Sequence, residues 1–349
     1  MRIELVTQMW PSRENPDLGS FLVPLTAELR RRGNEVEVAA ISRRGGAPTK
    51  YGRLIASSVA VARRFRPDVV FAHFLFPAGA AGVAASMAGR CPLVVMAHGT
   101  DVANLGEIRG VRTATARVIS RSAAVIANSG WLAERLAAAI PEAAAKTEIA
   151  DCGIDLEAFT PADAAPAREE LGWGGEGPAF LCVGSLIERK NVTGLADAFA
   201  ALGRGRLAFV GDGPLRPRLE GRPGVRVVGR IPQREVPRWV AACDVLCQPS
   251  LIEPFGQATL EGMAMERTVV ATTNGGPPEF VPPQAGVLVD PDDPAALRDG
   301  LERAAAMPSP NPAAREAAAL HDVRSETATM LAVLQRAVAD ARPRGAGDD

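Results

Sequence analysis

The chain has 349 residues, of which 47% are hydrophobic, and its formal net charge is −1. This length and apolar content suffice for one large or two ordinary domains. The near-neutral balance argues against a basic nucleic-acid-binding protein, so no nucleic-acid partner is expected. The five cysteines lack zinc-ligand spacing and are odd in number, which favours a reduced, cytoplasmic protein.

Membrane signals in the sequence are weak. Glu4 interrupts the start of the chain, so no signal peptide is predicted. The long uncharged run from Val69 to Gly89 contains His73 and Pro77, and a strand, a loop and a small-residue helix explain it better than a membrane span. A basic stretch from Arg43 to Arg66 is interpreted as a solvated surface, with peripheral contact to an anionic membrane or acceptor as the alternative.

Short β-branched runs alternate with helical stretches rich in Ala, Leu and Arg, a pattern that predicts parallel sheets covered on both faces. The first series of expected strands is 3–7, 36–40, 69–72, 93–97 and 125–127. The second series is 180–183, 207–210, 225–228, 245–247, 269–271 and 287–289. The fold class is therefore α/β, with two Rossmann-like, doubly wound parallel-sheet domains.

The two series are separated by residues 161–178, which are rich in Pro, Ala and Gly and are interpreted as a linker with a helical piece at 168–171. We expect an N-terminal domain over 1–160 and a C-terminal domain over 165–320. Residues 312–341 are expected to be helical, and 342–349 to form a loose tail. Ligands of such sheets bind beyond the carboxyl ends of the strands, and the cleft between two domains is the expected site.

The stretch from Glu253 to Glu261 is the most informative part of the chain. Its two glutamates lie eight positions apart, the first in a Pro-Phe-Gly loop and the second just inside an expected helix that opens near Gly256. The start of a helix attracts phosphate through its free N–H groups and positive dipole end. Carboxylates accept hydrogen bonds from hydroxyls. The combination predicts a site for a sugar nucleotide.

Other candidates follow expected strands. His98 and His73 each stand at the end of a strand and are candidates for a ligand site, with a structural histidine as the alternative. Gly19 follows the first strand and precedes a helix, where backbone could approach a phosphate, although an ordinary turn explains it equally simply. Lys190, with Arg189 beside it, could neutralise a diphosphate, and a solvated lysine is the alternative.

Two glycine-rich turns, 211–215 and 229–232, follow successive strands, and the second could present backbone groups to a nucleobase. Paired acids at Asp151/Asp155 and at Asp290/Asp293 could suggest a metal site. We interpret the first pair as part of a turn, and Asp293 as a helix N-cap before a proline. No metal ligand is assigned, and no cofactor is expected.

Together these segments resemble the retaining glycosyltransferase family 4, which has the two-domain GT-B fold. The similarity runs through nearly the whole chain in order. Its segments are His-Gly-Thr-Asp at 98–101, Asn-Ser at 128–129, 152–159 with Pro161, 184–191, Pro-Ser at 249–250, 253–264 and Gly-Gly-Pro-Pro-Glu at 275–279.

The resemblance implies a role for each candidate. Glu253 would hold hydroxyls of the donor sugar, with the backbone of Phe255 and Gly256 nearby, and Glu261 would bind the ribose. Lys190 would bind the diphosphate.

His98 would approach the donor sugar and the reacting centre, and Gly19 would let the N-terminal loop close over the phosphates. The backbone of Arg230 would lie near the base. The resemblance also implies that the helix at about 325–341 packs back onto the N-terminal domain.

Three positions depart from the family pattern. Ser185 stands where the family often has arginine, which leaves the diphosphate charge to Lys190 and Arg189. Gly262 replaces a usual alanine. Glu266 stands where the family commonly has glycine, at a position that often needs a positive φ.

The expected activity is metal-independent transfer of a hexose-type sugar from a nucleoside-diphosphate sugar, UDP- or GDP-linked, to a hydroxyl acceptor, with retention. The acceptor could be a cell-surface polysaccharide, a lipid-linked sugar or a small molecule. The alternatives are a nucleotide-sugar epimerase or hydrolase on the same fold, and a non-catalytic sugar-nucleotide-binding subunit.

Overall fold

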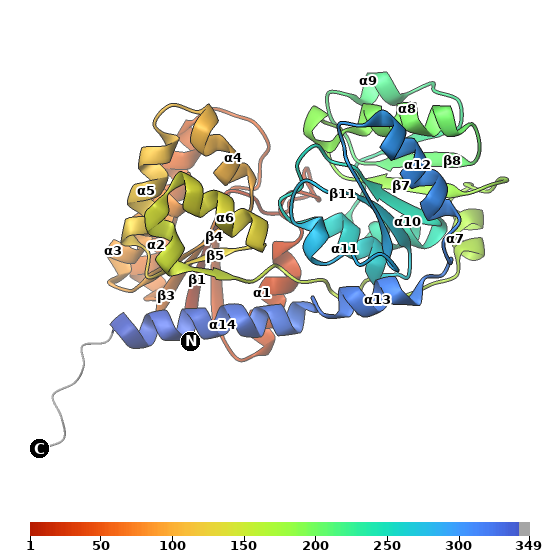
Figure 1. Ribbon diagram of the computed structural model, residues 1–349. Helices are drawn as coiled ribbons and strands as arrows, with labels where there is room; N and C mark the ends of the chain where they lie inside the picture. The colour runs from red at the N-terminus through yellow and green to blue at the C-terminus, as the bar shows by residue number, and fades with distance from the viewer. Residues whose placement is uncertain (342–349) are drawn as a thin grey trace, which may run out of the picture. The chain divides into compact units, whose positions relative to one another are not determined.

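The computed structural model describes residues 1–341, and within them the chain forms two compact units. The first unit contains residues 1–153 together with the C-terminal helix from Val323, and the second contains residues 154–322. Each unit has a six-stranded sheet in which every strand pair is parallel (Figure 1).

The first sheet has the strand order β2-β1-β3-β4-β5-β6. Its strands are β1 (Arg2–Thr7), β2 (Glu35–Ala40), β3 (Val69–His73), β4 (Leu93–Ala97), β5 (Ala124–Ala127) and β6 (Thr147–Ile149). The helices of this unit are α1 (Leu22–Arg31), α2 (Thr49–Phe65), α3 (Ala78–Gly89), α4 (Thr100–Glu107), α5 (Val111–Arg121), α6 (Gly130–Ala139), the 3-10 helix η1 (Pro141–Lys146) and α14 (Val323–Ala341).

The second sheet has the order β12-β11-β10-β7-β8-β9. Its strands are β7 (Ala179–Val183), β8 (Arg206–Val210), β9 (Val225–Gly229), β10 (Val245–Gln248), β11 (Thr268–Thr272) and β12 (Gly286–Val289). Its helices are α7 (Ala164–Glu170), α8 (Val192–Leu202), α9 (Arg216–Leu219), α10 (Val236–Ala242), α11 (Gln257–Ala264), α12 (Pro294–Ala305) and α13 (Pro312–Ala319), with 3-10 helices η2 (Glu188–Lys190), η3 (Gln233–Glu235) and η4 (Pro277–Glu279).

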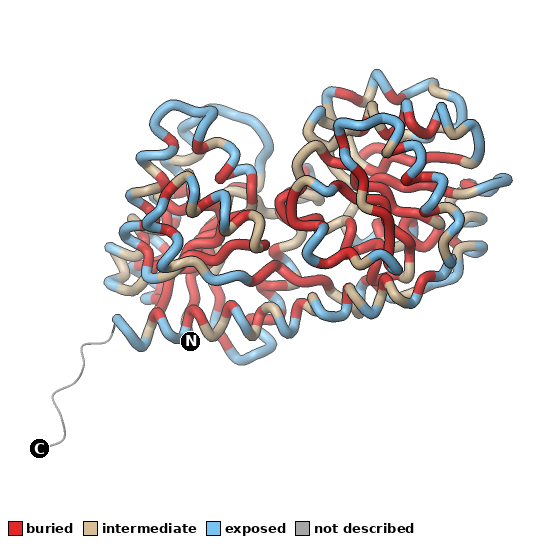
Figure 2. The backbone as a smooth tube through the Cα atoms, in the orientation of Figure 1, coloured by how far each residue is buried: buried red, intermediate tan, exposed pale blue. Residues whose placement is uncertain are grey.

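Both faces of each sheet are covered, so the central strands are buried on both sides (Figure 2). On the first sheet, α2, α3, α5 and α6 cover one face, and α1 and α14 cover the other. On the second, α7, α10, α11 and α13 pack on one face and α8, α9 and α12 on the other. Burial on both faces explains why the strands are continuous apolar runs in the sequence.

All eleven expected strands are present, and their bounds differ by at most one residue at either end. The strand β6 was missed because it is only three residues long, Thr-Glu-Ile, lies at the edge of its sheet and is largely exposed. A short edge strand lacks the apolar run on which the strand predictions depended.

The segment 161–178, expected to be a linker, packs within the second unit. The helix α7 begins at Ala164 rather than near Arg168, and Trp173 is 4% exposed in the core. The Arg168 guanidinium donates to the Ala242 carbonyl and pairs with Asp244 at 2.8 Å. Sequence composition alone did not indicate these distant partners.

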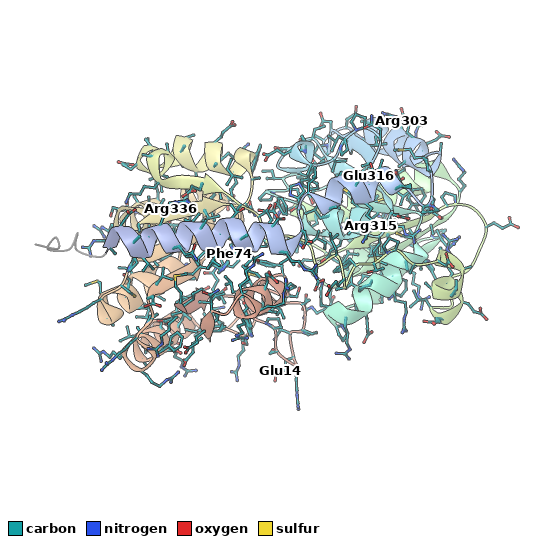
Figure 3. The ribbon with its side chains drawn as sticks, turned by 90° about the horizontal axis from the view of Figure 1, so that it is seen from below. Glu14, Phe74, Arg303, Arg315, Glu316 and Arg336 are labelled. Carbon is teal, nitrogen blue, oxygen red and sulfur yellow. The ribbon has the colours of Figure 1, made fainter. Side chains whose placement is uncertain are left out.

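The expected helix over 312–341 is interrupted between Ala319 and Val323, which gives α13 and α14. The helix α14 contacts α1, β3, β4 and β5 of the first unit, and Arg336 on it pairs with Glu148 of β6 (Figure 3). The expected loose tail, 342–349, lies outside the described residues. None of the helices within residues 1–341 is both long enough and apolar enough to cross a membrane.

Candidate functional site

A cluster of charged side chains lies in the second unit, around Glu253. This carboxylate is 7% exposed, accepts a hydrogen bond from the Ser250 hydroxyl at 2.8 Å and forms an ion pair with the Lys190 ammonium. Burial by itself would raise the pKa of Glu253, but Lys190 and Arg189 outweigh it, so the pKa lies below its usual value. Glu253 is therefore an ionised hydrogen-bond acceptor at neutral pH.

The loop that carries Glu253 is held by backbone hydrogen bonds. The Glu253 N–H donates to the Asn274 carbonyl at 3.0 Å, and the Gly276 N–H donates to the Glu253 carbonyl at 2.9 Å. A Cβ on Gly275 would lie 1.9 Å from the Glu253 oxygen, and Gly275 has a φ of +144°, so only glycine fits there. The Asn274 side chain also donates to the Leu251 carbonyl at 2.7 Å.

Arg189 supports the same loop. Its guanidinium donates to the Ile252 carbonyl at 3.0 Å, and its own carbonyl accepts from the Leu251 N–H at 2.9 Å. Arg189 thus joins the turn after β7 to the loop after β10, while Lys190 extends from that turn to the carboxylate. Ser185, the departure from the family pattern, lies half-buried in the same turn.

The expected helix start at Gly256 is confirmed, because α11 begins at Gln257 with Gly256 as its N-cap residue. Phe255, just before it, is 7% exposed and packs against Phe280 with ring centroids 5.3 Å apart. The loop is therefore anchored in the core immediately before the helix. The first-turn N–H groups and the positive dipole end of α11 form part of the same region.

Glu261 lies on α11 and is 6% exposed. Its Oε1 accepts a hydrogen bond from the Gln233 amide at 3.0 Å. Burial raises the pKa of Glu261 to about 8, and the bond from Gln233 only partly opposes this. The two glutamates of the motif therefore differ in charge at pH 7, with Glu253 ionised and Glu261 largely protonated.

Arg230 directly follows β9 and is exposed. Glu266, just past α11, has a φ of +58°, the left-handed conformation expected where the family has glycine. The second unit thus contains eight of the predicted site residues: Ser185, Arg189, Lys190, Arg230, Glu253, Phe255, Gly256 and Glu261. Among them, the structure shows a direct contact between Lys190 and Glu253.

The remaining candidates, Gly19, His73 and His98, belong to the first unit. Gly19 has a φ of +69°, and a Cβ there would lie 2.4 Å from the Met9 carbonyl oxygen, so the turn before α1 needs glycine. Gly19 precedes a helix as expected, and the Leu22 N–H at the start of α1 donates to the Gly19 carbonyl at 3.0 Å.

His98 follows β4 and is surrounded by polar and aromatic partners. Its Nε2 lies 3.0 Å from Nδ1 of His73, and its ring packs against Phe74 with centroids 4.5 Å apart. The buried Asp101 carboxylate accepts from the backbone N–H of His98, Gly99 and Leu75, at 3.1, 2.8 and 2.9 Å. Asp101 therefore joins the loop after β4 to the loop after β3.

Sequence reasoning assigned no role to Asp101, Ser250, Gln233 or Asn274. Asp101 and Ser250 stand within the motifs that carry the family resemblance, and this position in the sequence could have indicated a role for them. Gln233 begins η3 and Asn274 lies in the loop after β11. Both are distant along the chain from the glutamates that they contact, and no local pattern indicates those contacts.

The basic stretch consists of Arg43, Arg44, Lys50, Arg53, Arg63, Arg64 and Arg66. Its six arginines are exposed on or beside α2, and Lys50 is partly exposed. Two of them have acidic partners, because Arg44 pairs with Asp17 and Arg64 with Glu37.

Two family models match the chain. One, described as Glycosyltransferase Family 4, matches residues 19–158, and the other, described as Glycosyl transferases group 1, matches residues 177–306. The matches cover much of both units.

Curated relatives include TuaC of Bacillus subtilis, named for teichuronic acid biosynthesis, which is 28% identical over 72% of this chain and 65% of the relative. A GDP-mannose-dependent alpha-mannosyltransferase of Mycolicibacterium smegmatis is 33% identical over 67% of this chain and 64% of the relative. The matched part of the chain thus spans just under two thirds of the length of these relatives.

Solved structures resemble the whole chain. Sucrose-phosphate synthase from Thermosynechococcus elongatus has a TM-score of 0.80 at 21% identity, over 97% of this chain and 100% of that one. Anabaena HepE in complex with UDP-glucose has a TM-score of 0.75 at 21% identity, over 96% and 99%. The catalytic domain of starch synthase IV from Arabidopsis thaliana has a TM-score of 0.76 at 15% identity, over 97% and 99%. These similarities show that the chain has the GT-B fold.

Proposed function

The chain belongs to glycosyltransferase family 4, and on that premise we propose that it transfers a hexose-type sugar from a nucleoside-diphosphate sugar to a hydroxyl acceptor with retention at the anomeric carbon. The observation that carries the proposal is the buried ion pair between Lys190 and Glu253, beside the start of α11. This arrangement provides a cation for a diphosphate and an ionised acceptor for sugar hydroxyls in one place.

Glu253 suits the donor sugar because it is ionised and held rigidly. A carboxylate accepts hydrogen bonds from hydroxyls, and bonds to a charged acceptor are stronger than neutral ones. Its backbone bonds to Asn274 and Gly276 fix its position before a ligand arrives. Bonds to a preorganised acceptor avoid the cost of ordering a loop.

Lys190 is proposed to stabilise the departing diphosphate. Negative charge grows on the leaving oxygen as the glycosidic bond breaks, so a fixed ammonium stabilises the transition state more than the ground state. The N–H groups at the start of α11 would add to this effect. We propose that the leaving phosphate oxygen accepts the proton of the attacking hydroxyl, as the family resemblance implies, and that these groups make a metal ion unnecessary.

Glu261 is proposed to accept hydrogen bonds from the ribose hydroxyls, and the backbone at Arg230 to lie near the base. In the first unit, His98 is proposed to contact the donor sugar, and the Gly19 turn to approach the phosphates. These roles follow the family motif residue by residue.

The nucleotide base is best identified by thermal-shift screening with UDP, GDP and their sugars. A ligand at 100 times its Kd stabilises the protein by about 2.7 kcal/mol, so the preferred base should stand out. The relatives named above use or bind different nucleotides, GDP-mannose in one case and UDP-glucose in another. The acceptor is proposed to be a polysaccharide, a lipid-linked sugar or a small molecule with a free hydroxyl.

The central test is the variant Lys190→Met, assayed for sugar transfer with the donor that the screen identifies. Loss of a charge-stabilising donor should lower kcat/KM by roughly 10²- to 10³-fold. Lys50→Met is the matched control, since Lys50 is a partly exposed lysine whose ammonium donates to the Gly45 carbonyl. Transfer should also persist in the presence of EDTA.

Removing Lys190 alone leaves the buried Glu253 carboxylate without its ion-pair partner, and the loss of that partner is itself destabilising. The double variant Lys190→Met/Glu253→Gln removes both charges and serves as the folding control. If Lys190→Met folds and retains near-full transfer activity, the assignment of Lys190 is wrong. Release of free sugar from the donor without any acceptor product would instead indicate a hydrolase.

A further inference from the structure

Two of the three histidines in the chain contact one another in the first unit. His73 is the last residue of β3, and His98 follows the adjacent parallel strand β4. The Nδ1 of His73 lies 3.0 Å from the Nε2 of His98, within hydrogen-bond distance. One of these two nitrogens must therefore carry a proton and the other must accept it.

Both rings are neutral at pH 7. Burial lowers the pKa of His73 well below its ordinary value, and the neighbouring His98 lowers it further. Burial also lowers the pKa of His98 to about 3. A neutral imidazole carries one N–H and one acceptor nitrogen, so the proton between the rings decides what the outer nitrogen of each ring can do.

The buried end of His73 distinguishes the two arrangements. His73 is fully buried, and its Nε2 has no hydrogen-bond partner among the described residues. If His98 donated to His73, the single proton of His73 would stand on Nε2, where it would be a buried N–H without an acceptor. Buried N–H groups without an acceptor are rarer in folded proteins than buried acceptors without a donor. If His73 donates, Nε2 carries no proton and only an acceptor is left unpaired.

The surroundings hold both rings in place. The His73 ring packs against Phe71 with centroids 4.3 Å apart, and the His98 ring packs against Phe74 and Phe21 at 4.5 and 5.2 Å. Phe74 adopts a φ of +79°, and Figure 3 labels its position. The Asp101 carboxylate holds the backbone of His98 by accepting a hydrogen bond from the His98 N–H. The packing and hydrogen bonds of the loops after β3 and β4 therefore hold the two rings in contact.

We infer that His73 is a positioning residue that donates its Nδ1–H to His98 Nε2 and so fixes His98 as the Nδ1–H tautomer. His98 is the less buried of the two rings, and its Nδ1–H is then a hydrogen-bond donor. It suits an oxygen acceptor, such as a sugar hydroxyl or a phosphate oxygen, and it does not act as a base. The catalytic meaning of this tautomer rests on the proposed function, whereas the tautomer itself does not.

The direct test is long-range proton–nitrogen NMR of the protein labelled with ¹⁵N in its histidine rings. With three histidines in the chain, the resonances can be assigned by single substitutions, and His321 of the second unit serves as an internal reference. At pH 7 we expect His98 to carry its proton on Nδ1 and His73 also on Nδ1. Observation of the Nε2–H tautomer at His98 would overturn the inference.

Two substitutions of His73 separate positioning from folding. In His73→Asn, the side-chain NH₂ can take the place of the Nδ1–H donor, so His98 should keep its tautomer. In His73→Leu the donor is lost, so the ¹⁵N resonance of the unprotonated Nε2 of His98 should move downfield, to the position of a nitrogen that accepts no hydrogen bond. An unchanged His98 spectrum in His73→Leu would also overturn the inference.

Transfer kinetics provide a second readout. We expect His73→Leu to lose kcat, and His73→Asn to recover most of it, while thermal unfolding shows both variants folded. A loss that is the same in both variants would show that His73 has only a packing role. If the wild-type protein shows no transfer activity, the proposed function fails, and the NMR result still decides the tautomer.

Discussion

Glu4 offers a quantitative test of the structure that requires no ligand. It lies in the middle of β1, is fully buried, and neither of its carboxyl oxygens has a hydrogen-bond partner among the described residues. On the neighbouring strand it stands opposite Glu37. Burial and, to a smaller extent, the neighbouring Glu37 raise the pKa of Glu4 to about 8 against the opposing effect of Arg64.

The sign of the effect follows from proton binding. With an ordinary pKa of 4.5, Glu4 is ionised at pH 7 in the unfolded chain, but it is largely protonated in the folded protein. The folded state therefore binds more protons, and its stability falls as the pH rises from about 4.5 to about 8. The contribution is fully present below pH 4.5 and is lost above pH 8.

The magnitude follows from the same shift. Each pKa unit corresponds to about 1.4 kcal/mol, so the shift from 4.5 to about 8 corresponds to about 5 kcal/mol over the full range and about 3 kcal/mol between pH 4.5 and pH 7. The variant Glu4→Gln cannot ionise. Its free energy of unfolding, relative to that of the wild type, should therefore rise by these amounts as the pH increases.

The assay is urea unfolding at several pH values between 4 and 9, with hydrogen exchange of the β1 amides as a measure specific to the first unit. The unpaired amide of glutamine lowers stability equally at every pH, so the pH dependence of the difference is the decisive quantity. Glu14→Gln is the control, because Glu14 is exposed (Figure 3). A difference between Glu4→Gln and wild type that stays constant from pH 4 to 9 would refute the argument.

Two further predictions concern the second unit. Because Glu261 has a pKa of about 8, its ionised fraction at pH 7 is about one tenth. A nucleotide sugar that binds the ionised form should therefore bind roughly tenfold more tightly as ionisation approaches completion above pH 8, and calorimetry should detect proton release on binding at pH 7. An affinity that falls as the pH rises, or the same pH dependence of affinity in Glu261→Gln, would contradict the ribose role. Glu266 has a φ of +58°, so Glu266→Gly should be more stable than Glu266→Ala by about 1 kcal/mol in thermal or urea unfolding. Both variants lose the glutamate side chain, so equal stabilities would show that the left-handed backbone is not strained.

Much of the architecture was predictable because it depends on local pattern. Strands buried on both faces of parallel sheets need continuous apolar runs, and the runs in this sequence marked all the strands except the exposed edge strand β6. The start of α11 at Gly256 and the positive φ at Glu266 were likewise readable from the motif that contains them.

The chemical state of the candidate site was not readable in this way. Glu253 and Glu261 stand eight positions apart and look alike in the sequence, yet one is ionised beside Lys190 and the other is largely protonated. The difference arises from burial and from partners that are distant along the chain, such as Lys190, which precedes Glu253 by 63 residues. A pKa depends on the full three-dimensional surroundings of a group.

The sequence by itself determined the α/β class, the two series of strands and the motif residues that place the chain in its family, because periodicity and motif order are properties of neighbouring residues. Only the tertiary structure decided that His73 meets His98 and that Asn274 holds the Glu253 loop. It also showed that Glu4 is buried without a partner. The contacts of His73 with His98 and of Asn274 with Glu253 exist because parallel strands bring their carboxyl ends to one edge of a sheet, where residues far apart in the chain become neighbours.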